Sequence, residues 1–391
     1  MTRPDDDRVV VTGIGLVCAL GTDPDQVFTR ILDGEFAARE WPDLVADGFP
    51  ITVANRVEDA GEYGRRPARR GRALTVHAVG NAIADAGLGA AHLKNAGVYV
   101  GSTMGESAGF EAAAAYSATD LDDATADTFA AEIVREFGTN GTLRTYGTAC
   151  AAGNYAIGSA ARAIASGRID VAIAGGVDAF SRIAMLGFAR VRAMSPDRCR
   201  PFDRNRRGMQ LGEEAAFLVL ERERSATRRG ARRRAVIGSL GLSGDAHHPT
   251  APRPDGSGSA TALRSALLAT GVRANEIGWI NAHGTGTAAS DAAESAAVAT
   301  VFGDRTGPPV SSLKGAFGHC MGAAAAVEAA MTVLALERHV IPPTVGVLDV
   351  DDQLPIDVVV EPRPAPDLRW ALNCGNAFGG LNSALLICAA S

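Results

Sequence analysis

The sequence predicts a layered α/β protein, and three features of the chain support this prediction. Short apolar segments of strand length alternate with longer segments of helical spacing. Of the 391 residues, 47% are hydrophobic but only 5% are aromatic, and 45 are glycines. Such small side chains let helices and strands approach closely, as stacked layers require. The length is sufficient for a large buried core.

In the first half of the chain, strand-like segments alternate with helical ones. A charged, frayed start at 1–7 precedes a buried strand at 8–15, which we expect to end in a glycine turn. The later elements of this half are a helix at 73–87, strands at 97–102 and 143–148, an alanine-rich helix at 151–166 and a strand at 171–174.

The second half repeats this order. Its elements are a strand at 235–240, a helix at 260–269, a strand at 277–281, a turn at 311–319, a helix at 322–336 and strands at 370–373 and 383–388. The alternation favours βαβ units with largely parallel pairing. We therefore expect two related halves, 1–233 and 234–391, which pack as one body because no low-complexity linker separates them.

Composition narrows the class of protein further. The formal charge of −6 favours no nucleic-acid partner. No apolar run approaches the roughly 18 residues of a membrane helix, and no signal-like segment opens the chain, so we expect a soluble, cytoplasmic protein with no membrane contact. The six cysteines form no CxxC pair, which argues against a disulfide framework or a metal site but allows one reactive thiol.

Cys150 lies where a strand-like segment gives way to an alanine-rich helix. The positive end of the helix dipole favours a thiolate, so the pKa of this thiol is expected to fall below its free value of about 8.5. A cysteine nucleophile needs that environment. An inert buried thiol is the alternative, since cysteines in apolar stretches are commonly structural.

Two histidines occupy similar glycine-flanked turns. His283 follows a strand within NAHGTGT at 281–287, and His319 ends the turn before the next helix. Short neighbours leave room for a ligand, and Thr285 and Thr287 offer hydroxyls to an extended polar substrate arm. A single histidine is more often structural, but two in such turns favour a catalytic site.

Seven motifs along nearly the whole chain resemble those of β-ketoacyl synthases of the elongating fatty-acid and type II polyketide kind. They are RVVVTGIG at 8–15, GTACA at 147–151, RPFD at 200–203, LGE at 211–213, NAHGTGT at 281–287, Lys314 with Gly318-His319, and FGG at 378–380. Each motif alone is a weak signal, but all seven in the family's order are highly specific.

The resemblance implies a thiolase-like fold, in which two duplicated βαβαβ-type halves form five layers, α-β-α-β-α. It also implies that Cys150 takes the acyl chain from a phosphopantetheine thioester. His283 and His319 would assist decarboxylation of malonyl carrier protein and stabilise the resulting enolate. Two neutral imidazoles can hold an oxyanion through N–H bonds, so neither a metal nor a cofactor of the protein's own is expected.

Further roles follow from the same resemblance. Lys314 and Glu213 match a pair that orders the site. Phe378 matches the residue whose backbone N–H completes the oxyanion hole with that of Cys150, and whose ring gates the acyl pocket. The implied partners are an acyl carrier protein and a second subunit, either an identical chain or a related ketosynthase or chain-length subunit.

Arginines gather at 65–72 and again at 222–234. The second cluster is expected to be a solvated surface. In the first, Arg69 and Arg70 match the basic pair of the family's docking helix for the acidic carrier protein, where they would speed encounter. Pro67 and Gly71 interrupt the helical pattern, so we expect this segment to dock as a looser turn.

Two segments depart from the family pattern. The family's NSFGFGG motif is replaced at 375–380 by GNAFGG, so Asn376 stands at the first Phe and Ala377 at the intervening Gly. GSTMGE at 101–106 replaces GSGIGG and puts Met104 at a pocket-floor position. Met104 and Asn376 are therefore assigned to the acyl pocket. Both changes favour a specialised or polyketide pathway over a housekeeping fatty-acid enzyme.

Three alternatives stay open beside the elongating synthase. A thiolase shares the fold but uses a second cysteine near its C-terminus, where this chain has His319 after Lys314. An inactive chain-length partner usually lacks the nucleophile, which is present here. A non-elongating acyltransferase or starter-unit enzyme is disfavoured by the intact decarboxylation residues.

Overall fold

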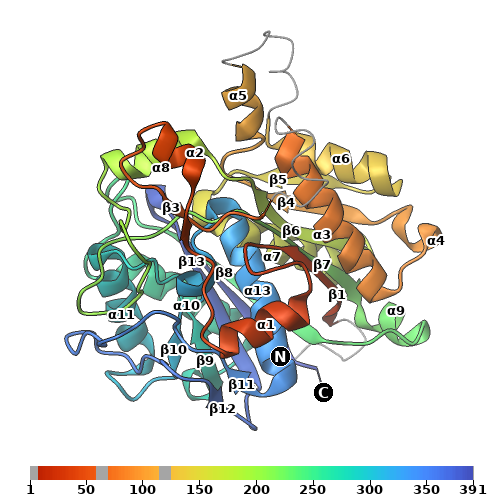
Figure 1. The fold of residues 1–391 in the computed structure, drawn as a ribbon. Coiled ribbons are helices and arrows are strands. Elements are labelled where there is room, and N and C mark those ends of the chain that lie inside the picture. The colour runs from red at the N-terminus through yellow and green to blue at the C-terminus, as the bar shows by residue number, and fades with distance from the viewer. Residues whose placement is uncertain (1–7, 59–68, 114–124, 391) are drawn as a thin grey trace.

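A large mixed β-sheet forms the centre of the computed structural model, which describes residues 8–58, 69–113 and 125–390 (Figure 1). In this part of the chain the sheet has ten strands. In spatial order they are β10 (Val310–Ser311), β9 (Ile277–Asn281), β13 (Trp370–Asn376), β14 (Leu381–Ala389), β8 (Ala235–Gly244), β1 (Val9–Val17), β7 (Glu214–Arg222), β6 (Val171–Asp178), β4 (Gly97–Gly101) and β5 (Leu143–Tyr146).

The order of the strands repeats on the two sides of the β1–β8 junction. Counted outward from that junction, the first side reads β1, β7, β6, β4 and β5, and the second reads β8, β14, β13, β9 and β10. Each side therefore has its first strand innermost, followed by its fifth, fourth, second and third. The shared order confirms that the fold consists of two duplicated halves.

The pairing of the strands differs from the largely parallel pairing that the sequence predicts. Among the neighbouring pairs within the described residues, four are parallel and five are antiparallel. The last strand of each half, β7 or β14, runs back between the first and fourth strands. The turn between β13 and β14 is too short for the crossover that a parallel pair needs.

The helices complete the five layers (Figure 1). Two of them, α7 (Ala152–Ala165) and α13 (Met321–Arg338), contact strands of both halves and form the central layer. The outer face of the first half is covered by α3 (Arg70–Ala86), and that of the second by α10 (Ser257–Thr270). Every residue of α13 from 321 to 336 is buried, which explains its alanine-rich composition.

Two glycines in β1 show how closely the layers pack. The sequence predicts a glycine turn at the end of this strand, but β1 continues to Val17. A Cβ atom on Gly13 or Gly15 would collide with backbone carbonyl oxygens of α3. These glycines therefore permit close contact between strand and helix and do not form a turn.

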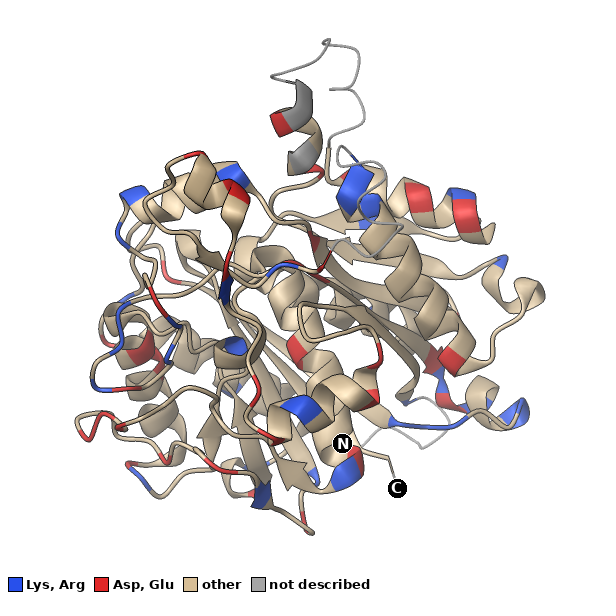
Figure 2. Ribbon diagram, viewed as in Figure 1, with Lys and Arg blue, Asp and Glu red and all other residues tan. Residues whose placement is uncertain are grey.

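The remaining elements connect or flank these layers. They are α1 (Pro24–Leu32), α2 (Pro42–Ala46), α4 (Ala90–Leu93), α5 (Ser107–Ala113), α6 (Asp127–Phe137), α8 (Arg182–Arg190), α9 (Glu223–Arg228), α11 (Ala288–Phe302), α12 (Lys314–Phe317), β2 (Arg39–Glu40), β3 (Val53–Ala54), β11 (Val340–Ile341) and β12 (Arg363–Pro364). Most charged residues lie at the periphery (Figure 2). Among the helices of the described residues, none has the length and apolarity that a membrane crossing requires.

Candidate active site

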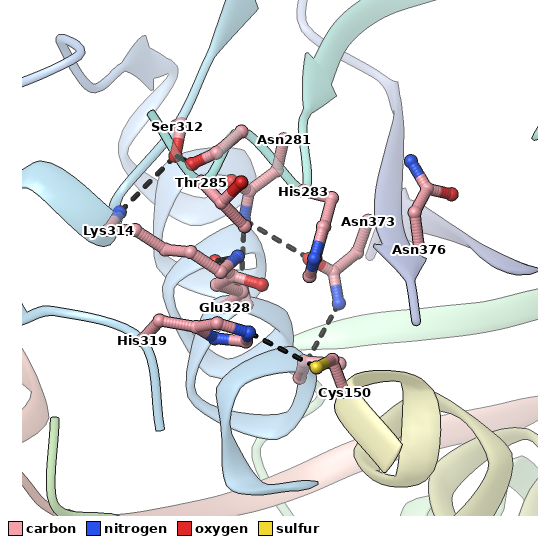
Figure 3. Close-up of polar contacts among 12 residues, drawn as sticks. Cys150, Asn281, His283, Thr285, Ser312, Lys314, His319, Glu328, Asn373 and Asn376 are labelled. Carbon is pink, nitrogen blue, oxygen red and sulfur yellow. Dashed lines mark hydrogen bonds and ion pairs between the residues drawn. The ribbon is translucent and has the colours of Figure 1, made fainter. Parts of the chain in front are cut away.

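Cys150 lies in a single turn of 3₁₀ helix, Ala149–Ala151, between β5 and α7. This is the turn between strand and helix that the sequence predicts. Ala149 has a φ of +47°, a left-handed conformation that is costly for a residue with a Cβ and that marks a tightly constrained turn. The side chain of Cys150 is buried, and its Sγ lies 3.1 Å from Nε2 of His319 (Figure 3).

The two predicted histidines converge on this sulfur. His283 follows the end of β9, and His319 lies between α12 and α13. Their rings meet edge to face, with 5.2 Å between centroids and an interplanar angle of 85°. One ligand atom from each of Cys150, His283 and His319 lies within 4.8 Å of the other two. Cys150 thus forms one compact cluster with two histidines that lie more than 130 positions away from it in the sequence.

Burial controls the protonation of this cluster. Removal from water raises the pKa of the Cys150 thiol to about 12, which corrects the expectation that the helix dipole lowers it. The positive charge of Lys314 and the backbone N–H groups of Cys150 and Phe378 act in the opposite direction but do not outweigh burial. Burial and the charge of Lys314 lower the pKa of both imidazoles well below 6.5, so both are neutral.

The loop that carries His283 is held by two buried carboxylates of α11. Glu294 accepts hydrogen bonds from the backbone N–H groups of His283 at 2.7 Å and Gly284 at 2.8 Å. Asp291 accepts from that of Thr285 at 3.1 Å. Neither carboxylate is among the site residues that the sequence predicts. The sequence signal for them is two acidic residues, three positions apart, that closely follow a glycine-rich turn.

Lys314 forms a buried ion pair with Glu328 of α13, whose neighbours in the helix are apolar (Figure 3). The pairing of Lys314 with Glu213 that the resemblance implies is therefore wrong. Glu213 instead binds the guanidinium of Arg70 and accepts from the backbone N–H of Val57 at 3.0 Å. Loss of either partner of Lys314–Glu328 would leave a buried charge uncompensated, which typically costs about 3–5 kcal/mol.

Three asparagines join α7, the helix after Cys150, to β9, the strand before His283. Asn281 of β9 donates to Oδ1 of Asn373 at 3.2 Å. Asn373 of β13 donates in turn to Oδ1 of Asn154 of α7 at 2.9 Å. Buried amides that hydrogen-bond to one another hold their elements in one relative position, although Oδ1 of Asn281 has no partner among the described residues. This ladder fixes the relative positions of the two halves of the site.

A cavity of about 360 Å³ opens onto the cluster. Its wall includes Cys150, His283 and His319, together with Thr285, Thr287, Asn376 and Phe378. Met104 does not line this cavity. Its side chain packs instead in an apolar cluster around Leu44 and Phe180, and its backbone N–H donates to Oδ1 of Asp178 at 2.9 Å. The assignment of Met104 to the acyl pocket therefore has no support from this cavity.

One of the two predicted docking arginines has a different role. Arg70 is buried within α3 and ion-paired with Glu213, so it cannot meet a partner protein, and the docking assignment for this residue is wrong. Arg69 is half-buried at the start of the same helix. Gly71 lies inside α3 and does not interrupt it. Pro67 and the arginines at 65 and 66 fall outside the described residues.

A cysteine and two histidines at such distances also match the ligand set of a zinc site. Lys314 argues against that use, because its buried positive charge is near enough to both imidazoles to lower their pKa. The same charge would repel a bound cation. It would, however, stabilise an anion that forms at the sulfur or near the imidazoles.

The five layers, the buried cysteine and the two neutral imidazoles define an acyl-transferring condensing enzyme of the thiolase-like class. Models of the β-ketoacyl synthase N-terminal and C-terminal domains match residues 6–226 and 234–348. The chain belongs to the β-ketoacyl synthase family.

Relatives with known names span almost the whole chain. Nodulation protein E of Rhizobium meliloti (strain 1021) is 34% identical, over 97% of this chain and 98% of that protein. The 3-oxoacyl-[acyl-carrier-protein] synthase 2 of the same strain is also 34% identical, with the same coverage. The structure of the ishigamide ketosynthase/chain length factor is 38% identical and superposes with a TM-score of 0.90, over 98% of this chain and 99% of that chain.

Proposed function

We propose that this protein joins an acyl group held on Cys150 to a malonyl group carried by an acyl carrier protein, with loss of carbon dioxide. The contact of 3.1 Å between Sγ of Cys150 and Nε2 of His319, beside the neutral ring of His283, carries the proposal. Both substrates would arrive on a phosphopantetheine arm. The family relation and the name of the 3-oxoacyl-[acyl-carrier-protein] synthase 2 relative support this substrate class.

Acyl loading begins when Sγ of Cys150 attacks the carbonyl carbon of the incoming thioester. Because burial keeps the thiol protonated, its proton must leave during attack, and Nε2 of His319 is in position to accept it. The backbone N–H groups of Cys150 and Phe378, which both favour negative charge at this point, donate to the oxyanion. The carbon–sulfur bond to the carrier then breaks, and its thiolate takes the proton.

Malonyl carrier protein enters next. Its carbon–carbon bond breaks, carbon dioxide leaves, and the electron pair forms an enolate. The neutral imidazoles of His283 and His319 can each donate an N–H to the enolate oxygen, His319 once its proton has moved from Nδ1 to Nε2, which faces the site. The enolate carbon attacks the acyl group on Cys150, and the carbon–sulfur bond breaks to free the cysteine thiolate. The thiolate takes up a proton from water, since its first proton left with the carrier of the acyl group, and the product leaves on the second carrier.

Several finer points belong to the same proposal. Thr285 and Thr287, whose hydroxyls lie 3.0 Å apart in the cavity wall, would bind the polar pantetheine arm. The two halves, 1–233 and 234–391, would each contribute one part of the site. The relation to nodulation protein E and to the ishigamide ketosynthase/chain length factor favours a specialised pathway and a second, related subunit.

The test is to incubate the purified protein with an acyl carrier protein charged with an acyl group and a second charged with malonate. The expected product is a 3-oxoacyl carrier protein, two carbons longer than the donor, with one carbon dioxide per product. If the acyl group is transferred to a carrier and no carbon dioxide is released, the protein is instead a starter-unit acyltransferase. Activity that appears only with an added second chain would identify the heterodimer.

The carrier protein is expected to dock at Arg192 and Arg207, which are exposed at the mouth of the cavity. Changing both to glutamate should raise the KM for carrier-bound substrate by about tenfold, since exposed charges mainly govern encounter with an acidic protein. The kcat with a small thioester substrate should change by less than about twofold. Steady-state kinetics at low salt measure both quantities.

The matched control is the same charge change at Arg224 and Arg228, which are exposed on α9. This control should leave the KM for carrier-bound substrate near that of the parent. Equal KM increases in the two double variants would show that net charge, and not a docking surface at the cavity mouth, determines encounter.

A further inference from the structure

Asn376 is the last residue of β13 and stands two positions before Phe378. Its side chain has partners on two helices. Nδ2 donates to Oε1 of Glu294 at 3.2 Å, and Oδ1 accepts from the hydroxyl of Ser259 at 3.2 Å. The side chain also forms part of the cavity wall. Asn376 thus connects the start of the Phe378 loop to α11 and α10.

The carboxylate of Glu294 is shared between two loops of the active site. Its oxygens accept from the backbone N–H groups of His283 and Gly284 at 2.7 and 2.8 Å, and also from Asn376. Glu294 is buried, so these bonds are shielded from water. The position of the Phe378 loop is therefore coupled to that of the His283 loop through a single side chain.

The far end of the Phe378 loop has anchors of its own, besides the backbone bonds of 3.0 Å that join Ala377 to Gly380 and to Leu381. The N–H of Gly379 donates to the carbonyl of Pro249 at 2.7 Å, and the N–H of Asp245 donates to the carbonyl of Gly380 at 2.9 Å. Between these anchors and Asn376 lie only Ala377 and Phe378. Ala377 has a φ of −110°, which suits an alanine and gives the chain less freedom than glycine would have.

We propose that Asn376 is a positioning residue that holds the backbone N–H of Phe378 against Cys150 by anchoring the loop to Glu294. A phenylalanine at this position, as in the NSFGFGG pattern, has no group that can donate to the carboxylate. This inference rests on the proposed function, because the N–H of Phe378 matters only if an oxyanion forms at Cys150. According to this inference, the segment just before Phe378 is held in one position in this chain.

The test separates the two half-reactions. Asn376→Leu keeps the size of the side chain but removes its donor. Loading of Cys150 from an acyl thioester should slow by about tenfold, the scale expected when an oxyanion donor is displaced but not lost. Malonyl decarboxylation should fall less than loading, because Glu294 keeps its hydrogen bonds to the backbone N–H groups of His283 and Gly284 in the variant. Asn376→Gln retains the donor and should recover about a third or more of the parent loading rate.

Ser239→Ala is the matched control. It removes a hydrogen bond of 2.7 Å between β8 and the carbonyl of Ala266 on α10, away from Asn376, and both rates should stay at the parent level. Thermal unfolding checks that each variant is folded. If Asn376→Leu does not fold, Asn376→Ala takes its place in the test.

Three results would overturn the inference. Unchanged loading in Asn376→Leu, beside an active parent, would show that the loop needs no such anchor. Equal loss of loading and decarboxylation would show that Asn376 supports the whole site and not the N–H of Phe378. A parent protein that neither loads nor decarboxylates would overturn the proposed function, and this inference with it.

Discussion

Cys150→Ala is expected to abolish covalent loading from an acyl thioester, because the variant has no sulfur to carry the acyl group. Alanine is smaller than cysteine and fits the same buried turn, so the fold should persist. Mass spectrometry of the intact protein after incubation with an acyl donor measures the adduct. The adduct should fall to the detection limit, since the covalent step requires the sulfur of Cys150.

Cys18→Ala is the control, because burial also raises the pKa of the Cys18 thiol to about 12. Cys18 lies directly after β1 and does not line the cavity. This variant should load as the parent does. An acyl adduct that survives on Cys150→Ala would contradict the assignment of the nucleophile.

The raised pKa of Cys150 adds a dependence on pH. A thiol whose pKa is about 12 is largely protonated at neutral pH, and its thiolate fraction grows as the pH rises. Alkylation of the free protein by iodoacetamide should therefore keep accelerating between about pH 7 and 9. A plateau near pH 7 would show that the thiolate is already formed in the resting protein.

Local patterns were sufficient to predict much of the fold. The strand before Cys150 and the helix after it follow from an apolar run and an alanine-rich segment, both of which act over short distances. The direction of β7 and β14 does not follow from local pattern, because a buried strand reads alike in parallel and antiparallel pairs. Predicting largely parallel pairing was wrong for this reason.

The candidate site was predictable where short motifs carry the chemistry. Cys150, His283 and His319 stand in glycine- or alanine-flanked turns, and the structure brings them together. The ion-pair partners of buried charged residues, in contrast, cannot be predicted from the spacing of residues in the sequence. Nothing local distinguishes Glu213 from Glu328 as the partner of Lys314. A glutamate in the apolar middle of α13 does, however, indicate a buried polar partner.

Arg70 shows the same limit on the surface. An arginine beside other arginines in the sequence predicts an exposed basic patch. In the fold, however, the start of α3 passes over the segment that carries Glu213, and the ion pair buries the guanidinium. The arginines at the cavity mouth, 192 and 207, come from loops whose positions depend on the tertiary structure.

His283→Ala is expected to suppress malonyl decarboxylation by about a hundredfold or more, the scale for losing one donor to a developing oxyanion. Loading of Cys150 should suffer less, because the imidazole in contact with the sulfur belongs to His319. His319→Ala should slow decarboxylation to a similar extent and loading as well. Release of carbon dioxide from malonyl carrier protein, measured without an acyl donor, isolates the step.

The pH profile of decarboxylation tests why these imidazoles are effective. Burial and the charge of Lys314 lower the pKa of both rings well below 6.5, so they gain a proton only when the pH falls far below that value. Between about pH 6.5 and 8 neither ring should titrate, and a change of the parent rate in this range should instead follow Asp291 and Glu328, whose pKa burial raises to about 7. His283→Asn keeps an N–H donor and should retain more activity than His283→Ala. Full carbon dioxide release by His283→Ala would instead mean that this imidazole has only a structural role.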